Sequence, residues 1–285
     1  MKQINTGLGS VAFVLLLAAC SRDVSTAPQG SRASTPAILD ASPPAASVFT
    51  AAGDIAPTVN AFRAALGDLN GNLPGSRLVG RREINWDAVP AAFTNTNDFP
   101  GDFFNQPAAG RARGAEFTTP GTGFRTSDVN FADLNPDFAG QFVFFSPIKT
   151  FAAVGSNRMT VTFFVAGSDT AATSTGFGVV FSDVDRNGSA SIRLFDAAGE
   201  ALGRFAAPVS PSGVSFVGAV FPTAIVARVE ITSGHGAVGA DATDIDDRDR
   251  EPARDLVIMD DFIYGEPTAT VVGSSGEAIA ARSRP

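Results

Sequence analysis

The sequence predicts an all-β fold, an antiparallel β-sandwich with one short N-terminal helix. Short apolar segments recur about every ten residues in the second half of the chain. Glycine and proline separate these segments, and no helical pattern lies between them. Because parallel strands need long crossover connections, this spacing indicates antiparallel pairing.

The strand pattern is clearest between residues 158 and 264. Ile225, Ala227, Val229 and Ile231 alternate with Val226, Arg228, Glu230 and Thr232, as expected for a strand with one face buried. The turns "DRNG", where Gly188 can adopt positive φ, and "DAAGE" join neighbouring strands. The predicted strands are RMTVTFFV, GFGVVFSDV, SIRLFD, ALGRF, GVSFVGAVF, AIVARVEIT and DLVIMDDFIY.

One segment before the strands has a helical pattern. In "IAPTVNAFRAALGDLNGN", Val59, Phe62 and Leu66 fall on one helical face, and Gly67 can end the helix. Residues 78–149 are less regular, and we expect short strands and long ordered loops there. The sequence thus predicts a signal peptide over 1–19, a Ser/Ala/Pro-rich tether over 20–47, a single β-sandwich domain over 48–267 and a flexible tail over 268–285.

The amino-terminal segment has the features of a lipoprotein signal peptide. Lys2 is followed by nine apolar residues, Val11–Ala19, too few for a membrane span, which needs about 20. "LAAC" at residues 17–20 resembles the bacterial lipobox, in which the cysteine is acylated and becomes the first residue after cleavage. The resemblance implies an exported lipoprotein held in the cell envelope by lipid on Cys20, and Ser21 favours the outer membrane. The alternative is an ordinary secretory signal with a chance cysteine.

The second half of the chain also resembles a known class of module. "GVVFSDVD", "IRLFDAAGEALG", "SFVGAVF", "ARVEI" and "MDDFIYG" follow one another as in the jelly-roll modules of bacterial exported proteins, including those with a PEP-CTERM sorting tail. The resemblance covers residues 160–265. It implies a jelly-roll sandwich with a binding or structural role, in which lipid on Cys20 would replace the sorting tail.

Composition excludes several classes of partner and chemistry. The net charge of −8 argues against nucleic acid as a partner. There are 24 Phe but only one Trp and one Tyr, so a broad aromatic platform for glycans is poorly supported, and we expect Trp86 in the core. His235 is the single histidine and no G-x-S-x-G elbow is present, which argues against a Ser-His-Asp triad and against zinc.

Acidic residues give three candidate calcium sites, two of which lie in loops or turns. Asp183, Asp185 and Asn187 alternate in "DVDRNG", as in the first half of an EF-hand loop, but Leu194 stands where a bidentate Glu is needed. An EF-hand is therefore excluded, and a different calcium turn and a simple Asx-rich turn both remain open. The run Asp241, Asp244, Asp246, Asp247 and Asp249 is a further set of oxygen ligands, with a solvated loop as the alternative.

The last predicted strand contains two adjacent acids, Asp260 and Asp261, among apolar residues. Successive strand residues face opposite sides, so one carboxylate must point inward unless a bulge intervenes. A buried carboxylate needs a partner. The jelly-roll resemblance implies a structural Ca²⁺ on this pair, and the competing interpretation is an ion pair with Arg81 or Arg82.

Two functions follow. The first is a lipid-anchored, exported β-sandwich for binding or structure, with the membrane as partner through its lipid and a glycan or a protein as candidate ligand. The alternative is a carboxylate-based carbohydrate hydrolase on the same scaffold, since two distant acids leave no local motif.

Overall fold

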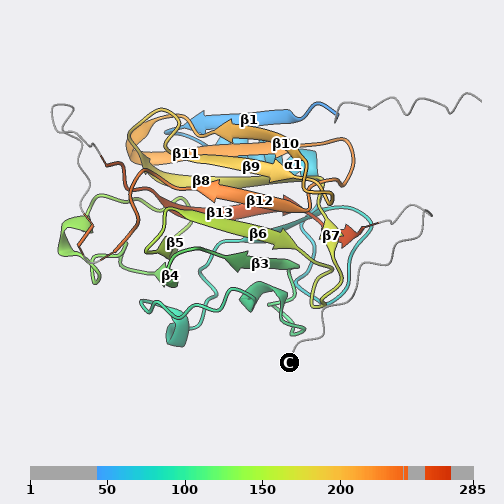
Figure 1. Ribbon diagram of the computed structural model, residues 1–285, viewed down its shortest axis with the longest axis horizontal. Coiled ribbons are helices and arrows are strands. Elements are labelled where there is room, and N and C mark those ends of the chain that lie inside the picture. Colours follow the sequence, from blue (N-terminus) through green and yellow to red (C-terminus); the bar gives the residue numbers. More distant parts are fainter. Residues whose placement is uncertain (1–43, 240, 243–253, 271–285) are drawn as a thin grey trace, which may run out of the picture. The chain divides into compact units, whose positions relative to one another are not determined.

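The predicted antiparallel sandwich is confirmed. The computed structural model describes residues 44–239, 241–242 and 254–270, and every pair of named strands in these ranges is antiparallel. Figure 1 shows the two main sheets stacked as layers. One sheet has the order β1 (Ser47–Ala52), β11 (Ser210–Val220), β8 (Gly176–Val184), β13 (Ile258–Gly265), β5 (Thr150–Val154), β4 (Gly123–Ser127), with β2 (Arg81–Ile84) also paired to β13. The other has the order β10 (Ala201–Ala206), β9 (Ser191–Phe195), β12 (Arg228–Thr232), β6 (Arg158–Phe163), β3 (Ala115–Thr118).

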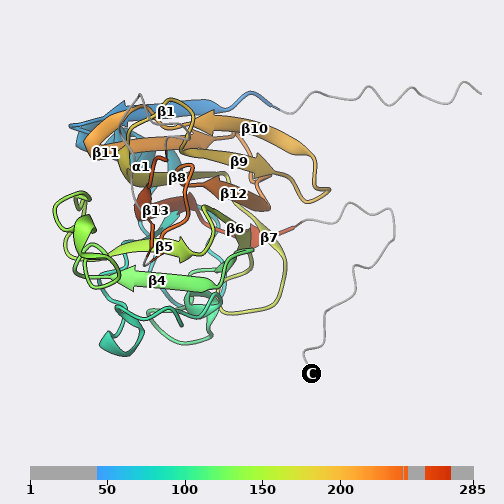
Figure 2. The same cartoon turned by 60° about the vertical axis from the view of Figure 1, so that its left-hand side comes forward.

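Eight of these strands have jelly-roll connectivity. From β5 onward the chain passes repeatedly between the two sheets, apart from the β9–β10 hairpin within the second sheet, and gives the spatial orders β5-β13-β8-β11 and β6-β12-β9-β10. These are the two four-stranded sheets of a double Greek key. The additional strands β1, β4 and β3 lie at the margins, and Figure 2 shows β4 beside β5. A small separate sheet pairs β7 (Ala172–Thr173), which precedes β8, with β14 (Thr268–Ala269), which follows β13.

The strands match the predicted segments closely. β8 spans the whole of GFGVVFSDV, and β6, β9, β10, β11 and β13 each overlap their predicted strand. β12 begins at Arg228, later than the alternating pattern suggests. Ser47–Ala52 had no strand prediction, because "SVFTAA" is too short to show a clear alternation; it pairs with β11 along its whole length.

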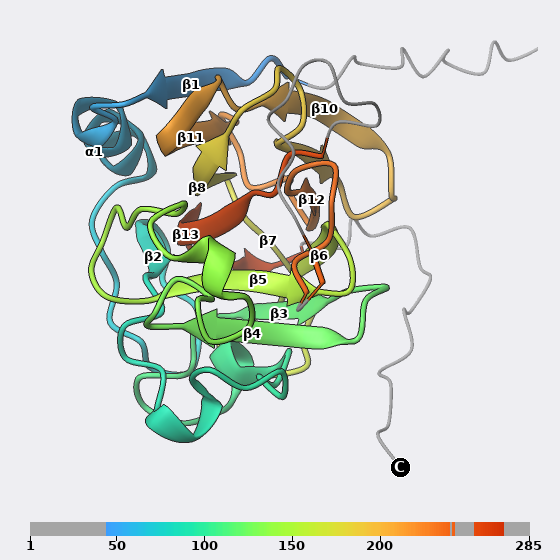
Figure 3. The same ribbon diagram turned by 90° about the vertical axis from the view of Figure 1, so that its left-hand side faces the viewer.

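The α-helix of the described residues, α1, runs from Ala56 to Leu66 and buries Val59, Phe62 and Leu66 as predicted. Gly67 ends it with φ 94°, in the left-handed region where glycine has no steric penalty. α1 packs on the outer face of the larger sheet, on the side away from β10, β12 and β6 (Figure 3). Three short 3₁₀ helices lie in the irregular part of the chain, at Ala91–Phe93, Phe103–Asn105 and Pro136–Phe138.

The sandwich core is built mainly from phenylalanine. Trp86 lies among them, fully buried, with its ring stacked on that of Phe151 at 3.8 Å between centroids. Its indole N–H donates to the Asp260 carbonyl at 2.8 Å. The expectation that Trp86 is a core residue is confirmed.

Candidate functional site

The strongest candidate site is the acidic pair of β13. Between Met259 and Phe262 the register of β13 against β8 shifts by one residue. This β-bulge places both Asp260 and Asp261 on the outer face of the sheet, beneath α1 and the loop that holds Phe145 and Ser146. Both residues are buried, with exposures of 0% and 2%.

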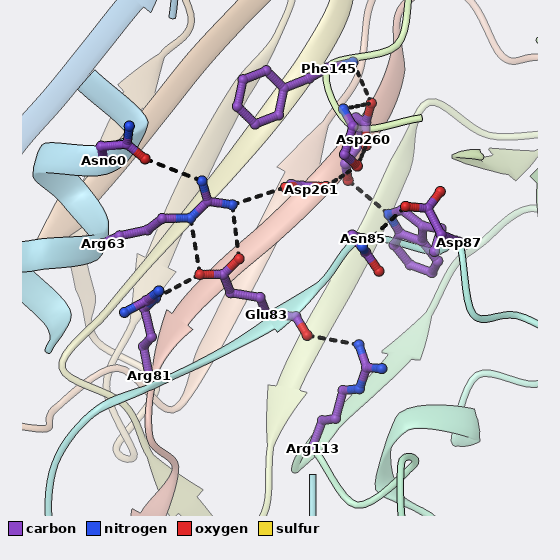
Figure 4. A network of polar contacts seen from close by, with 12 residues as sticks. Asn60, Arg63, Arg81, Glu83, Asn85, Asp87, Arg113, Phe145, Asp260 and Asp261 are labelled. Atoms are coloured by element: carbon purple, nitrogen blue, oxygen red, sulfur yellow. Dashed lines mark hydrogen bonds and ion pairs between the residues drawn. The ribbon is translucent and has the colours of Figure 1, made fainter. Parts of the chain in front are cut away.

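Asp260 receives its hydrogen bonds from this loop. The backbone N–H groups of Phe145 and Ser146 donate to its Oδ2 at 2.7 and 3.2 Å. The Ser146 hydroxyl lies 3.1 Å from Asp260 Oδ1 and 2.6 Å from Asp261 Oδ1. One serine thus touches both carboxyl groups. Figure 4 shows Asp260 and Asp261 between Phe145 of this loop and Arg63.

Asp261 has a cationic partner. Arg63 of α1 donates to Asp261 Oδ2 at 3.3 Å and, through two nitrogens, to Glu83 of β2 at 3.0 and 2.8 Å. Arg81 also donates to Glu83, at 2.6 Å. The helix is therefore tied by one guanidinium to two strands of the sheet (Figure 4).

Because both carboxyl groups are buried, Asp260 and Asp261 together hold one proton at neutral pH. Burial and the neighbouring charge of Asp261 raise the pKa of Asp260 to about 8. Burial also raises the pKa of Asp261, but hydrogen bonds from Ser146 and Asp260 and the charge of Arg63 oppose that rise. Asp260 is accordingly the protonated member, and Asp261, beside Arg63, carries the negative charge.

The pair fits a calcium ion poorly. All four carboxyl oxygens already face N–H or O–H donors of the protein, whereas Ca²⁺ needs six to eight free oxygen ligands. In the described part of the chain, no three His, Cys, Asp or Glu side chains converge as metal ligands. The arrangement favours the competing interpretation, a buried pair with an arginine, although that arginine is Arg63.

Neither arginine named from the sequence reaches the pair. Arg81 contacts Glu83 instead. Arg82 points the other way from β2 and forms a fully buried ion pair with Glu266 at 2.7 Å. The alternation of β2 explains the difference, because consecutive residues of a strand face opposite sides.

The "DVDRNG" turn is held by side chains and amides of the protein. Asp183, at the end of β8, accepts from the Ser212 N–H at 2.6 Å and from the Gln141 amide at 2.9 Å. Asn187 is exposed. The amides of Asp185 and Arg186 donate to Oδ2 of Asp255, at 3.2 and 3.1 Å, so a carboxylate from the segment before β13 organises this turn.

Several remaining candidates lie elsewhere or outside the described residues. His235 is exposed in its loop, and its N–H donates to the Asp255 carbonyl at 2.8 Å. Asp241 is exposed. Cys20 and the rest of the acidic run, namely Asp244, Asp246, Asp247 and Asp249, lie outside the described residues.

Sequence reasoning missed the three residues that complete these sites. Arg63 occupies an ordinary position on an amphipathic helix, Ser146 lies in an irregular loop, and Asp255 belongs to a strand-like segment. None of them belongs to a local motif, and only the fold brings them to their partners.

Surface hollows in the described residues lie away from the acidic pair. One of about 630 Å³ is bordered by α1, β1 and the exposed apolar residues Leu78 and Val79. A second of about 490 Å³ lies beside His235 and Arg254. Asp260 and Asp261 line neither hollow.

Comparison with known proteins gives little further information. No family model and no curated protein matches the chain. Among solved structures, the chain is similar to the enzymatically active domain of the bacteriophage CBA120 tailspike protein 4, with 16% identity and a TM-score of 0.26. The match covers 62% of this chain and 22% of the tailspike chain, and a likeness this distant carries no argument about activity.

Proposed function

We propose that this chain is an exported, lipid-anchored jelly-roll that acts as a binding module at the cell envelope and not as an enzyme. The observation that carries the proposal is the burial of its paired acids. Asp260 and Asp261 are 0% and 2% exposed, and their oxygens are engaged by the protein, so the pair serves the fold.

The anchor is argued from the sequence. The apolar run and "LAAC" at residues 17–20 support lipid on Cys20. Among the described residues, no helix is long and apolar enough to cross a membrane.

The alternative, a carboxylate-based carbohydrate hydrolase, has one observation in its favour. A carboxyl group with a pKa of about 8, such as Asp260, holds a proton at neutral pH, as a general acid must. Glycoside hydrolysis, however, needs two acids about 5 to 9.5 Å apart on opposite sides of an accessible bond. Asp260 and Asp261 instead lie side by side against Ser146 beneath the loop.

Two measurements test the proposal. Mass spectrometry of the protein extracted from membranes is expected to find diacylglycerol and a third acyl chain on Cys20, and the Cys20→Ser variant is expected in the soluble fraction. Incubation with a panel of polysaccharides is expected to release no new reducing ends. An unmodified Cys20, or catalytic release of sugar ends that Asp260→Asn abolishes, would overturn it.

A further inference from the structure

The outer face of the five-stranded sheet is a regular polar surface. The strand register places three rows of side chains across it. Its inward-facing residues, such as Val161 and Ile231, are in the core. The outward rows are Ala201, Phe195, Arg228, Thr162, Glu116; then Arg204, Arg193, Glu230, Thr160, Thr118; then Ala206, Ser191, Thr232, Arg158.

Four arginines of this surface form what we call the arginine face: Arg158, Arg193, Arg204 and Arg228. Arg158, Arg193 and Arg204 are exposed. None of these three forms an ion pair with any residue in the described part of the chain, whereas Arg228 pairs with Glu230. Among the described residues, these three guanidinium groups therefore have no carboxylate partner, and their charges can be neutralised by an anion.

The arginine face is preorganised. Arg193 and Arg228 lie over the ring of Phe195, with their guanidinium carbons 4.8 and 3.8 Å from its centroid. Arg204 donates to the Ser191 hydroxyl at 3.3 and 3.1 Å. Stacking and hydrogen bonding reduce the freedom that each side chain would lose on binding.

The outer faces of the two sheets differ in whether other parts of the chain pack on them. α1 and the loop around Phe131, Phe138 and Phe142 pack on the outer face of the larger sheet. In Figure 1, no helix of the described residues crosses the five strands β10, β9, β12, β6 and β3. Only two acids, Glu116 and Glu230, share this surface with its four arginines, although the chain as a whole carries a net charge of −8.

We propose that the arginine face binds an acidic polysaccharide, a chain of sugar units that carry carboxylates. Guanidinium groups match carboxylates in charge and bidentate geometry. Arg204 on β10 and Arg158 on β6 are three strands apart, about 14 Å at the usual strand spacing, so an extended polymer crossing the strands meets several arginines. The surface has no large exposed apolar side chain to insert into lipid, and the ring of Phe195 is covered by arginines and so is not free to stack on a base.

The inference rests on the proposed binding function and names its ligand class. It is tested with the purified full-length chain in non-ionic detergent, by affinity electrophoresis and calorimetry with polygalacturonate, with neutral dextran as the control polymer. We expect binding to polygalacturonate that weakens as salt increases, and no retardation by dextran.

Variants locate the surface. Arg193→Gln combined with Arg204→Gln is expected to weaken binding about tenfold or more, since charge-assisted hydrogen bonds are lost. Arg77→Gln is the control for lost charge, because Arg77 is exposed on a different loop, and it is expected to change affinity less than twofold. Unchanged melting temperatures confirm that all variants are folded.

Three results would overturn the assignment. They are equal weakening by Arg77→Gln, equal binding of dextran, or binding confined to phosphatidylglycerol vesicles with none to polygalacturonate. New reducing ends or an unmodified Cys20 would instead contradict the proposed function, so the two failures are distinguishable.

Discussion

Asp260 and Asp261 are consecutive residues of one strand, yet their carboxyl groups lie on the same face of the sheet and contact the same hydroxyl, that of Ser146, at 3.1 and 2.6 Å. Regular strand geometry would place them on opposite faces. The bulge between Met259 and Phe262 removes this conflict by inserting one residue. The result is a buried pair that holds a proton on Asp260 and a charge on Asp261.

The chain should lose stability as pH rises from about 4 to about 8. The pKa of Asp260 is about 8 in the folded chain against an ordinary value of 3.8, so in this window the folded state binds a proton that the unfolded state has released. Its stabilising contribution is complete below pH 3.8, declines through the window and is absent above about pH 8. Urea unfolding at about pH 5 and pH 9 measures the free energy of unfolding at each pH, and we expect the lower value at pH 9.

Asp260→Asn should remove much of that pH dependence. The amide oxygen can accept from Phe145 and Ser146 as the carboxyl does, and its NH₂ can replace the shared proton toward Asp261. We expect a higher urea midpoint than the wild type at pH 9 and a smaller change between pH 5 and 9. An unchanged pH profile would show that Asp260 is not the protonated group.

Asp261→Asn is the matched control for that variant. It removes the charge that Arg63 neutralises, and we expect it to lower the free energy of unfolding by about 1–3 kcal/mol. The loss should be larger at pH 5 than at pH 9, because at pH 9 the variant also removes the repulsion between the charge of Asp261 and the ionised Asp260. Equal effects of the two asparagine variants would contradict the assignment of charge within the pair.

The sequence predicted most of the strands well because the residue pattern within each of these segments is sufficient to identify it as a strand. Short apolar runs bounded by glycine and turn residues sufficed for β6, β8 and β9, and the spacing of Val59, Phe62 and Leu66 sufficed for α1. One carboxylate of the acidic pair was predicted to point inward, since its neighbours in the strand are apolar, whereas the structure buries both, Asp260 and Asp261.

The partners of the pair could not be predicted in this way. Arg63 and Asp261 are 198 residues apart, and only the packing of α1 on the sheet brings them together. Arg82 was a candidate for this role, but its position in β2 directs it to the opposite side and to Glu266. Whether Arg82 points to the same face of the sheet as the acidic pair or to the opposite face depends on the register between β2 and β13. No local sequence pattern determines that register.

Arg82→Met should strongly destabilise the protein. Arg82 and Glu266 are both buried and share two hydrogen bonds of 2.7 Å, and Arg82 also donates to the carbonyl groups of Ala112, Gly75 and Leu73. The variant leaves the buried Glu266 carboxylate without its cation, with hydrogen bonds only from the Asn70 amide and the Arg77 N–H, and breaking such a buried pair costs about 3–5 kcal/mol. Urea unfolding followed by circular dichroism measures the loss.

Arg82→Lys separates charge from geometry at this site. Lysine keeps the charge but cannot make the two parallel bonds to Glu266, so we expect a loss between those of Arg82→Met and the wild type. Arg77→Gln, an exposed arginine in the same part of the chain, should change stability by less than about 0.5 kcal/mol. A loss in Arg82→Met no larger than this control would show that the ion pair is dispensable.

Trp86 should behave as a buried reporter of the aromatic core. It is the single tryptophan, it is fully buried, and five phenylalanine rings surround it. Its emission should be blue-shifted and resistant to acrylamide quenching, both lost on unfolding. Trp86→Phe should lower the free energy of unfolding by about 1–3 kcal/mol, because the hydrogen bond to the Asp260 carbonyl disappears. Free quenching in the native state would contradict this placement.

Two glycines in the strands beneath α1 determine how closely the helix packs on the sheet. A Cβ at Gly218 would lie 2.6 Å from the ring of Phe62, and one at Gly178 would lie 2.8 Å from it. Phe62 is fully buried and anchors the helix against Phe216 at 5.2 Å between ring centroids. The absence of side chains at these two positions therefore allows the helix to approach the sheet.

Gly218→Ala should displace Phe62 and lower the free energy of unfolding by about 1–3 kcal/mol, the usual cost of overpacking. Gly71→Ala is the control, since a Cβ there meets nothing within 4 Å. Because Arg63 follows Phe62 directly, Gly218→Ala should also strain the contact of Arg63 with Asp261. Its effect should then be less than additive with that of Asp261→Asn, and a double-mutant cycle measures this coupling. If the two free-energy changes add fully, the packing of α1 on the sheet and the acidic pair are independent.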